Sequence, residues 1–191
     1  MDPLYELDEI REKGQVTLLH ISDTPDAIYP FIFSVIDRLK PDYIIHTGDI
    51  VDNIKLAAGG SILAYQRSLQ KFIKELKKRD WAEKYIIPGN HDSIDCLREY
   101  VGGDIKLKEE GDIINIGGTD IGLAHYLEDL PDNTLMSLYG HDNSLKDSDN
   151  KLFLNGLLNL NIILLPSREI FKISYPGETD FNRGYRRLKL P

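Results

Sequence analysis

The residues best suited to chemistry follow a short apolar run, Tyr85-Ile86-Ile87, which predicts a buried strand. Pro88-Gly89 turns the chain there, so Asn90, His91 and Asp92 come just past the strand end. In open α/β sheets, ligands bind beyond the carboxyl ends of the strands. An amide, an imidazole and a carboxylate at such a place could bind a metal ion or transfer protons. The same residues could also form a turn that caps the following helix.

The rest of the chain repeats this layout, with a polar residue directly after each of several predicted strands. These residues are Asp23, Asp49, Asn90, His125 and His141. Core packing does not explain five such placements in succession. Oxygen ligands together with two imidazoles suit a first-row divalent ion such as Mn, Fe or Zn. A carboxylate shared by two such ions belongs to the clamp that supports in-line displacement at phosphorus.

The elements that must position these residues alternate at first between strands and helices. Buried-strand patterns cover 15–22, 43–47 and 85–87, and helical patterns cover 26–40, 62–79 and 93–101. This order predicts a parallel sheet with helical cover. After Gly102 the pattern becomes strand-rich, over 112–116, 119–124, 135–139, 152–154, 162–165, 171–174 and 185–190. We therefore expect an α/β protein with two packed sheets and helices outside.

Length and composition indicate one globular domain. The chain has 191 residues, 41% of them hydrophobic and 28% charged, which suffices to bury a sizeable core. Residues 1–14 are predicted to form an amphipathic N-terminal arm and 15–191 the single domain.

The sequence also predicts where the protein works and what it binds. We expect a cytoplasmic protein with no membrane association, because no apolar run reaches the length of a membrane span, the start does not resemble a signal peptide, and Cys96 is the only cysteine. The formal net charge of −8 argues against nucleic acid as a partner. It permits a small phosphate ligand, because a bound cation can supply the local positive field.

In this order, the motifs resemble those of the calcineurin-like metallophosphoesterase superfamily. They are Asp23, Gly48-Asp49-Ile50-Val51-Asp52, Gly89-Asn90-His91-Asp92, a single His125, and Gly140-His141. The resemblance runs from Asp23 to about Asn143, and the short chain is similar to the compact phosphodiesterase-type members. It implies a four-layer α-β-β-α sandwich of two mixed sheets flanked by helices, with a dinuclear metal centre on the strand ends.

The resemblance also implies a role for each motif residue. Asp49 would bridge the two ions, and Asp23 would belong to the first metal site. Asn90, His125 and His141 would complete the second site. His91 would donate to the substrate phosphate or to the leaving oxygen, and Asp92 would orient it.

The chain departs from the family pattern at two positions, and both affect the first site. The family's Asp-x-His reads Asp23-Thr24-Pro25 here, and its Gly-His-x-His reads Gly140-His141-Asp142-Asn143. Asn143 is a weak candidate ligand, and Asp26 or Asp142 could substitute for a lost one. Oxygen donors in place of imidazoles favour Mg²⁺ or Ca²⁺ over Zn²⁺ or Fe. We therefore expect one well-bound ion, Mn, Fe or Zn, and a second that is weak or absent.

Several other polar residues have structural interpretations. His20 and His46 are expected to be buried and hydrogen-bonded, and Asp52 to fix its loop rather than bind metal. A cluster of four basic residues near the end could attract a phosphate or an acidic partner, but a solvated face on a terminal strand is favoured. The cluster consists of Arg183, Arg186, Arg187 and Lys189.

The function predicted on these grounds is metal-dependent hydrolysis of phosphate mono- or diesters on a small substrate, with activity that the two lost histidines could attenuate. The alternative is a catalytically silent interaction or regulatory module that keeps this fold and one ion. Nuclease activity is disfavoured by the acidic balance. The sequence makes no prediction of the oligomeric state.

Overall fold

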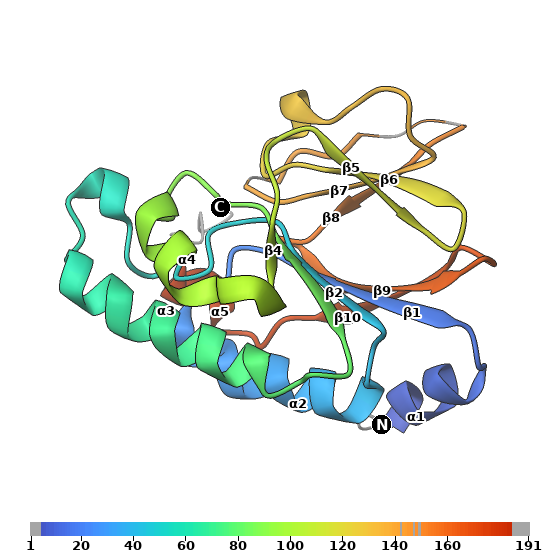
Figure 1. Cartoon of the computed structure of the whole chain (residues 1–191), viewed down its shortest axis with the longest axis horizontal. Helices are drawn as coiled ribbons and strands as arrows, with labels where there is room; N and C mark the ends of the chain where they lie inside the picture. The colour runs from blue at the N-terminus through green and yellow to red at the C-terminus, as the bar shows by residue number, and fades with distance from the viewer. Residues whose placement is uncertain (1–4, 142, 147, 149, 185–191) are drawn as a thin grey trace, which may run out of the picture.

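The computed structural model of this protein describes residues 5–141, 143–146, 148 and 150–184 (Figure 1). The predicted strand at 185–190 therefore lies outside the described residues. So do three members of the basic cluster, Arg186, Arg187 and Lys189, and the alternative ligand Asp142.

The larger sheet has six strands in the order β10-β9-β1-β2-β3-β4. The strands are β1 (Val16–Ile21), β2 (Tyr43–His46), β3 (Glu83–Ile86), β4 (Lys106–Leu107), β9 (Asn159–Leu165) and β10 (Glu169–Ser174). Strands β1 to β4 pair in parallel, whereas β9 is antiparallel to both β1 and β10. In the parallel part, Leu18 pairs with Tyr43 and Ile21 with His46, so β1 and β2 end side by side. Strand β1 is buried on both faces, as its continuous apolar run predicts.

The smaller sheet has four strands in the order β5-β6-β7-β8, and it is mixed as well. The strands are β5 (Asp112–Ile116), β6 (Thr119–Leu123), β7 (Met136–Tyr139) and β8 (Leu152–Asn155). Strands β5 and β6 form an antiparallel hairpin, and β6, β7 and β8 are parallel. The ends of β6 and β7 therefore point the same way, which brings the residues that follow them together.

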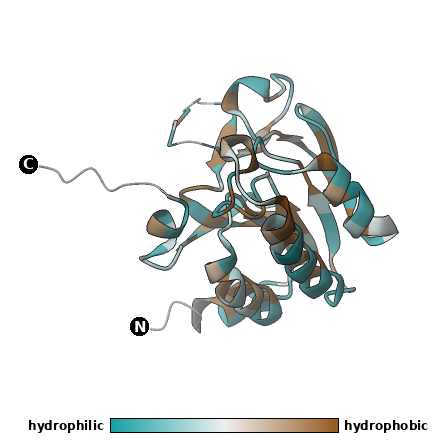
Figure 2. Cartoon of the chain, turned by 90° about the vertical axis from the view of Figure 1, so that its left-hand side faces the viewer, coloured by the Kyte–Doolittle hydropathy of each residue, from teal (hydrophilic) through white to brown (hydrophobic). Residues whose placement is uncertain are grey.

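Four helices pack on the outer face of the six-stranded sheet (Figure 1). They are α1 (Tyr5–Glu12), α2 (Tyr29–Leu39), α3 (Ile62–Lys77) and α4 (Ile94–Val101). Ser61 and Ser93 begin α3 and α4 by accepting hydrogen bonds from the backbone N–H groups of Ala64 and Cys96. Hydrophobic and hydrophilic residues mix along these helices, as expected for elements that are buried on one face (Figure 2).

Two apolar clusters hold the layers together. One lies between the helices and the six-stranded sheet and includes Leu19 and Ile21 of β1. The other lies between the two sheets and includes Leu18. The alternation along β1 thus divides its side chains between both clusters. The predicted arm is helix α1, whose Leu7 and Ile10 are buried in the first cluster.

The predicted α/β fold with two mixed sheets and helices is confirmed. In the described residues, the helical layer lies on the six-stranded sheet, while a single 3-10 turn, Leu127–Asp129, follows the four-stranded sheet's β6. Within the same part of the chain, no helix is long and apolar enough to cross a bilayer.

Candidate metal centre

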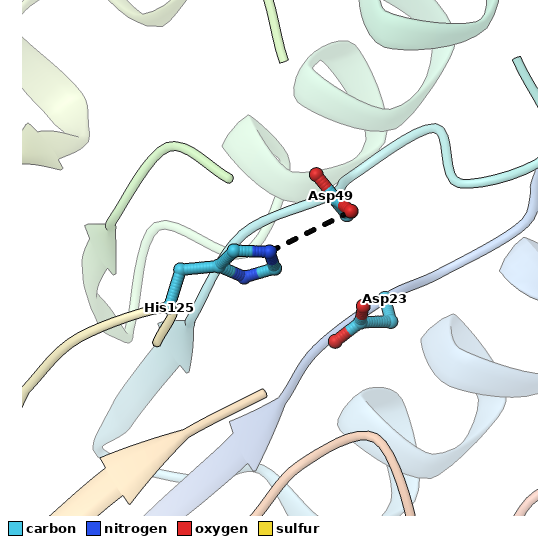
Figure 3. A group of neighbouring side chains, drawn as sticks. All are labelled: Asp23, Asp49 and His125. Carbon is cyan, nitrogen blue, oxygen red and sulfur yellow. Dashed lines mark ion pairs between the residues drawn. The ribbon is translucent and has the colours of Figure 1, made fainter. Parts of the chain in front are cut away.

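The polar residues that follow the strands gather at one edge of the two sheets. Asp23, Asp49 and His125 each offer a ligand atom that lies within 4.8 Å of those of the other two. Figure 3 shows these side chains converging from three separate segments. They are 1%, 2% and 0% exposed, respectively. Carboxylates are rarely buried so completely unless a cation balances them.

Two further predicted ligands, Asn90 and His141, join this group. The Asn90 amide oxygen Oδ1 lies 3.0 Å from His125 Nε2 and 3.1 Å from His141 Nδ1. His125 Nε2 in turn lies 3.6 Å from Asp49 Oδ2. The structure therefore brings together one carboxylate, one amide oxygen and two imidazole nitrogens. We call Asp49, Asn90, His125 and His141 the four-donor set.

His125 is held in the orientation that a ligand needs. Its Nδ1 lies 2.7 Å from the carbonyl oxygen of Thr47 and donates to it, which leaves Nε2 facing the other donors. Its backbone N–H donates to Glu110 Oε2 at 2.6 Å. The ring of Tyr126 packs against both imidazoles, with its centroid 5.2 Å from that of His125 and 4.3 Å from that of His141.

The backbone at the centre is unusual. Asp23, Asp49 and His141 adopt left-handed conformations, with φ of 53°, 54° and 69°. Such conformations are costly for residues other than glycine and often mark functional sites. The glycines of two motifs allow close approach: a Cβ at Gly89 would lie 2.3 Å from Asp49 Oδ1, and one at Gly140 would lie 2.5 Å from Asp23 Oδ2. These motifs therefore need glycine for steric reasons.

Asp92 ties the loops of the centre together. Its carboxylate accepts hydrogen bonds from the backbone N–H groups of Asp49 (2.8 Å), Ile50 (3.1 Å) and Gly89 (2.9 Å) and from the hydroxyl of Tyr65 (3.0 Å). Burial raises the pKa of Asp92 to about 6, and the charge of Asp49 adds to the increase. The predicted orienting bond between Asp92 and His91 is absent from the hydrogen bonds of the described residues. Asp92 instead positions the loops that carry Asp49 and Asn90.

His91 contributes to the centre through its backbone and leaves its ring free. Its N–H donates to Asp49 Oδ1 at 2.8 Å. Its ring nitrogen Nδ1 is buried and has no hydrogen-bond partner in the structure. Burial lowers the pKa of His91. An unpartnered buried nitrogen is rare in a folded protein, and a catalytic role is one explanation for it.

The charges of the centre influence one another strongly. Burial alone would lower the pKa of His125, but the ion pair with Asp49 and the charge of Asp23 raise it to about 9. Burial also raises the pKa of Asp49, but the interactions with His125 outweigh it and hold the pKa below its ordinary value. For Asp23, burial and the charge of Asp49 together raise the pKa. Without a cation, the centre therefore keeps a proton on His125.

The other half of the centre has fewer donors. We call Asp23, Pro25 and Asn143 the Asp23 side. Pro25 has no side-chain donor, and Asn143 is exposed. Asp23 Oδ2 accepts a hydrogen bond from the backbone N–H of His141 at 3.1 Å. The alternative ligand Asp26 accepts a hydrogen bond from Ser68 Oγ at 2.7 Å instead.

The two halves of the centre suit different metal ions. The four-donor set fits a divalent ion of the Mn, Fe or Zn type, because it combines imidazole nitrogens with carboxylate and amide oxygens. The Asp23 side offers only oxygen donors, the Asp23 carboxylate and the exposed Asn143 amide, so it does not fit a second ion of the Fe or Zn type. The assignment of individual ligands stays a prediction.

Three structural interpretations of polar residues can be compared with the structure. His20 and His46 are buried, and their Nε2 atoms lie 2.9 Å from the hydroxyls of Thr47 and Thr24. Burial lowers the pKa of each imidazole to about 3. Both are buried, hydrogen-bonded histidines, as predicted. Asp52 is also buried and pairs with Lys55 in its own loop.

The solvated surface predicted for the basic cluster is wrong for Arg183, which is 2% exposed and donates from Nε to the backbone oxygen of Asp23 at 2.7 Å.

Sequence reasoning also missed three residues near the centre, Tyr65, Glu110 and Tyr126. Tyr126 directly follows His125, so its position next to a predicted ligand was an available signal. Tyr65 and Glu110 come from distant segments, and no local pattern marks them.

Comparison with known proteins finds one matching family model and several similar solved structures. The model of the calcineurin-like phosphoesterase family matches residues 16–180. Among curated proteins, no sequence matches this chain. The solved structure of Yfce, a phosphoesterase from E. coli, is similar with a TM-score of 0.58 at 13% identity, covering 84% of this chain and 100% of that chain. A metallophosphoesterase from Sphaerobacter thermophilus gives a TM-score of 0.49 at 12% identity, covering 87% and 92%.

Proposed function

Because the chain belongs to the calcineurin-like phosphoesterase family, we propose that it hydrolyses phosphate mono- or diesters of a small substrate with the help of one divalent ion. The family supports metal-dependent hydrolysis of phosphoesters in general. The small substrate and the single ion are our additions, argued from the charge of the chain and from its donors.

The observation that carries the proposal is the convergence of the four-donor set. Asn90 Oδ1 lies within 3.1 Å of both imidazole nitrogens, and the bond from His125 Nδ1 to the Thr47 oxygen directs Nε2 toward it. Neighbouring ligands of one ion have such spacings, because each lies about 2.0–2.2 Å from the metal. When bound, a divalent ion polarises a phosphoryl oxygen and lowers the pKa of water.

The residues of the chain then have distinct tasks. His91 holds the Asp49 carboxylate with its backbone N–H and presents an imidazole whose Nδ1 is unpartnered. We assign this imidazole to the substrate, as a donor to the phosphate or to the leaving oxygen. Asp92 keeps the loops that carry Asp49 and Asn90 at a fixed distance from each other.

The Asp23 side favours a second candidate function, because it lacks two imidazoles that the family pattern would supply. In this alternative, the chain is a catalytically silent interaction module that keeps the fold and one ion. The apolar residues Leu7 and Ile10 of helix α1 are buried in the chain's own core, so this face of the helix is not available to a partner.

One experiment separates the two candidates. Purified protein is incubated with bis-p-nitrophenyl phosphate or p-nitrophenyl phosphate and Mn²⁺, Mg²⁺, Zn²⁺ or Fe²⁺, and its metal content is measured in parallel. We expect hydrolysis that is lost in both His91→Ala and Asn90→Ala. The control Asn150→Ala, in an exposed turn, should keep the activity. A protein that holds its ion but turns over neither ester with any of the four metals would establish the silent module.

A further inference from the structure

The Asp23 side contains a buried cation that belongs to the chain itself. Arg183 follows the short helix α5 (Thr179–Asn182) and is 2% exposed. It also lines a pocket of about 190 Å³ together with Asn143. The guanidinium therefore lies in the half of the centre that has lost its imidazoles.

Four contacts fix the Arg183 side chain. Its Nε donates to the backbone oxygen of Asp23 at 2.7 Å, and its Nη1 donates to the Leu157 oxygen at 3.0 Å and to Asp180 Oδ1 at 3.1 Å. The guanidinium also packs on the ring of Tyr175, at 4.7 Å from its centroid. A planar group held on several sides cannot easily move to make room for an ion.

Two buried polar atoms near the Arg183 guanidinium lack hydrogen-bond partners. Arg183 Nη2 has no hydrogen-bond partner, and neither has Asp52 Oδ2, which lies 4.0 Å from Arg183 Nε. Leaving such atoms unpaired in the interior is costly, so they need an explanation. Electrostatics supplies one, because a guanidinium stabilises nearby carboxylates without touching each oxygen.

The charge balance of the region points the same way. Three carboxylates, those of Asp23, Asp49 and Asp52, are each at most 2% exposed. Buried charges need opposite charges nearby. His125 pairs with Asp49 and Lys55 pairs with Asp52. Asp23 lies near the charges of both His125 and Arg183. Since His125 must lose its proton to bind an ion, Arg183 is the cation that stays beside Asp23 when the four-donor set is occupied.

We propose that Arg183 supplies the positive charge on the Asp23 side in place of a second metal ion, and that its charge keeps a second ion out. This inference rests on the proposed function, because it presumes that the four-donor set binds the first ion. Arg183 is a positioning residue here: its buried guanidinium acts through Asp23 and Asp52 and does not reach the substrate.

The test rebuilds the lost ligands. The double variant Pro25→His, Asn143→His restores the family pattern, and a triple variant adds Arg183→Gln, which keeps hydrogen-bonding capacity but removes the charge. The matched control adds Arg79→Gln instead, since Arg79 is also buried but pairs with Asp37 and Glu75 on the helices. Each protein is equilibrated with Mn²⁺, freed of excess metal and analysed for Mn per chain.

We expect one Mn per chain in the natural protein, the double variant and the Arg79 control, and two in the triple variant. The paramagnetic resonance spectrum should change only in the triple variant, from that of an isolated Mn²⁺ to that of a coupled pair. A purely structural role for Arg183 would not change the ion count.

Three results would overturn the inference: two ions in the double variant, one ion in a folded triple variant, or two ions in the natural protein. Where the triple variant does not fold, the double variant can still overturn the inference, because two ions in a chain that keeps Arg183 contradict it. A natural protein without any bound ion would overturn the proposed function itself, and with it the basis of this inference.

Discussion

The two halves of the centre share one backbone design and differ in their side chains. Asp49 and His141 in the four-donor set and Asp23 on the other side all adopt left-handed conformations after a strand. On one side the chain supplies two imidazoles and an amide, and on the other a proline and an exposed asparagine. The two halves thus share a backbone conformation, and they differ in the donor atoms that they offer to an ion.

The largest effect should separate the two halves directly. Asp49→Asn removes the carboxylate next to His125, so we expect ion affinity and hydrolysis to fall more than about 100-fold, beyond the loss typical of residues that only support ligands. Asp23→Asn should cost about tenfold or less, because Asp23 mainly holds the His141 backbone in the absence of a second ion. Competition with a chelator measures both affinities. Equal losses would show that Asp23 is a full ligand.

The pH dependence of ion uptake should come from the four-donor set. The pKa of His125 is about 9, and its Nε2 must lose the proton to bind metal. The affinity for Mn²⁺ should therefore rise about tenfold per pH unit between pH 6.5 and 8.5, with release of one proton. Calorimetry in buffers of different ionisation enthalpy measures this release. Uptake without proton release would place the ion away from His125.

The same proton affects stability in the opposite direction. The folded-state pKa of His125 lies above its unfolded value of about 6.5, so its stabilising contribution is complete below pH 6.5 and is lost as the pH rises to about 9. We expect the metal-free protein to lose up to about 3 kcal/mol of unfolding free energy over this range. Urea denaturation with and without Mn²⁺ tests this, because the loaded protein should not show the loss.

A smaller effect is expected where the loops are tied together rather than where the ion binds. Asp92→Asn replaces one acceptor oxygen by an NH₂ donor. This donor then lies against backbone N–H groups, which are donors as well. The unfolding free energy should fall by about 1–3 kcal/mol, and ion affinity by about tenfold. The exposed neighbour Asp95→Asn is the control and should change neither. Unchanged stability in Asp92→Asn would mean that the loops hold without this carboxylate.

The smallest effect belongs to the Asp23 side. Asn143 is exposed, and removing its amide in Asn143→Ala should change ion affinity and hydrolysis less than about twofold, within the usual range for surface substitutions. The same assays measure it. A tenfold loss would show that this amide is a ligand and that the Asp23 side binds an ion after all.

Much of this arrangement was predictable from the sequence, because strands that end in polar residues meet at one edge of the sheets. The apolar run before Asp49 and the Pro-Gly turn before Asn90 are local patterns with a direct structural reading. Sequence reasoning failed where a partner comes from a distant segment. Tyr65 reaches Asp92 from helix α3, and the burial of Arg183 depends on how the segment after helix α5 folds back onto Asp23.

The left-handed backbone conformation of the candidate ligand residues has a consequence for any attempt to raise the thermal stability of this protein. Glycine adopts such conformations freely, so a glycine at position 141 would relieve a backbone cost of about 1–2 kcal/mol. The same substitution would remove the imidazole of His141 from the centre. Thermal screening alone would therefore select inactive variants here, and a search for tougher versions has to monitor ion binding at each step.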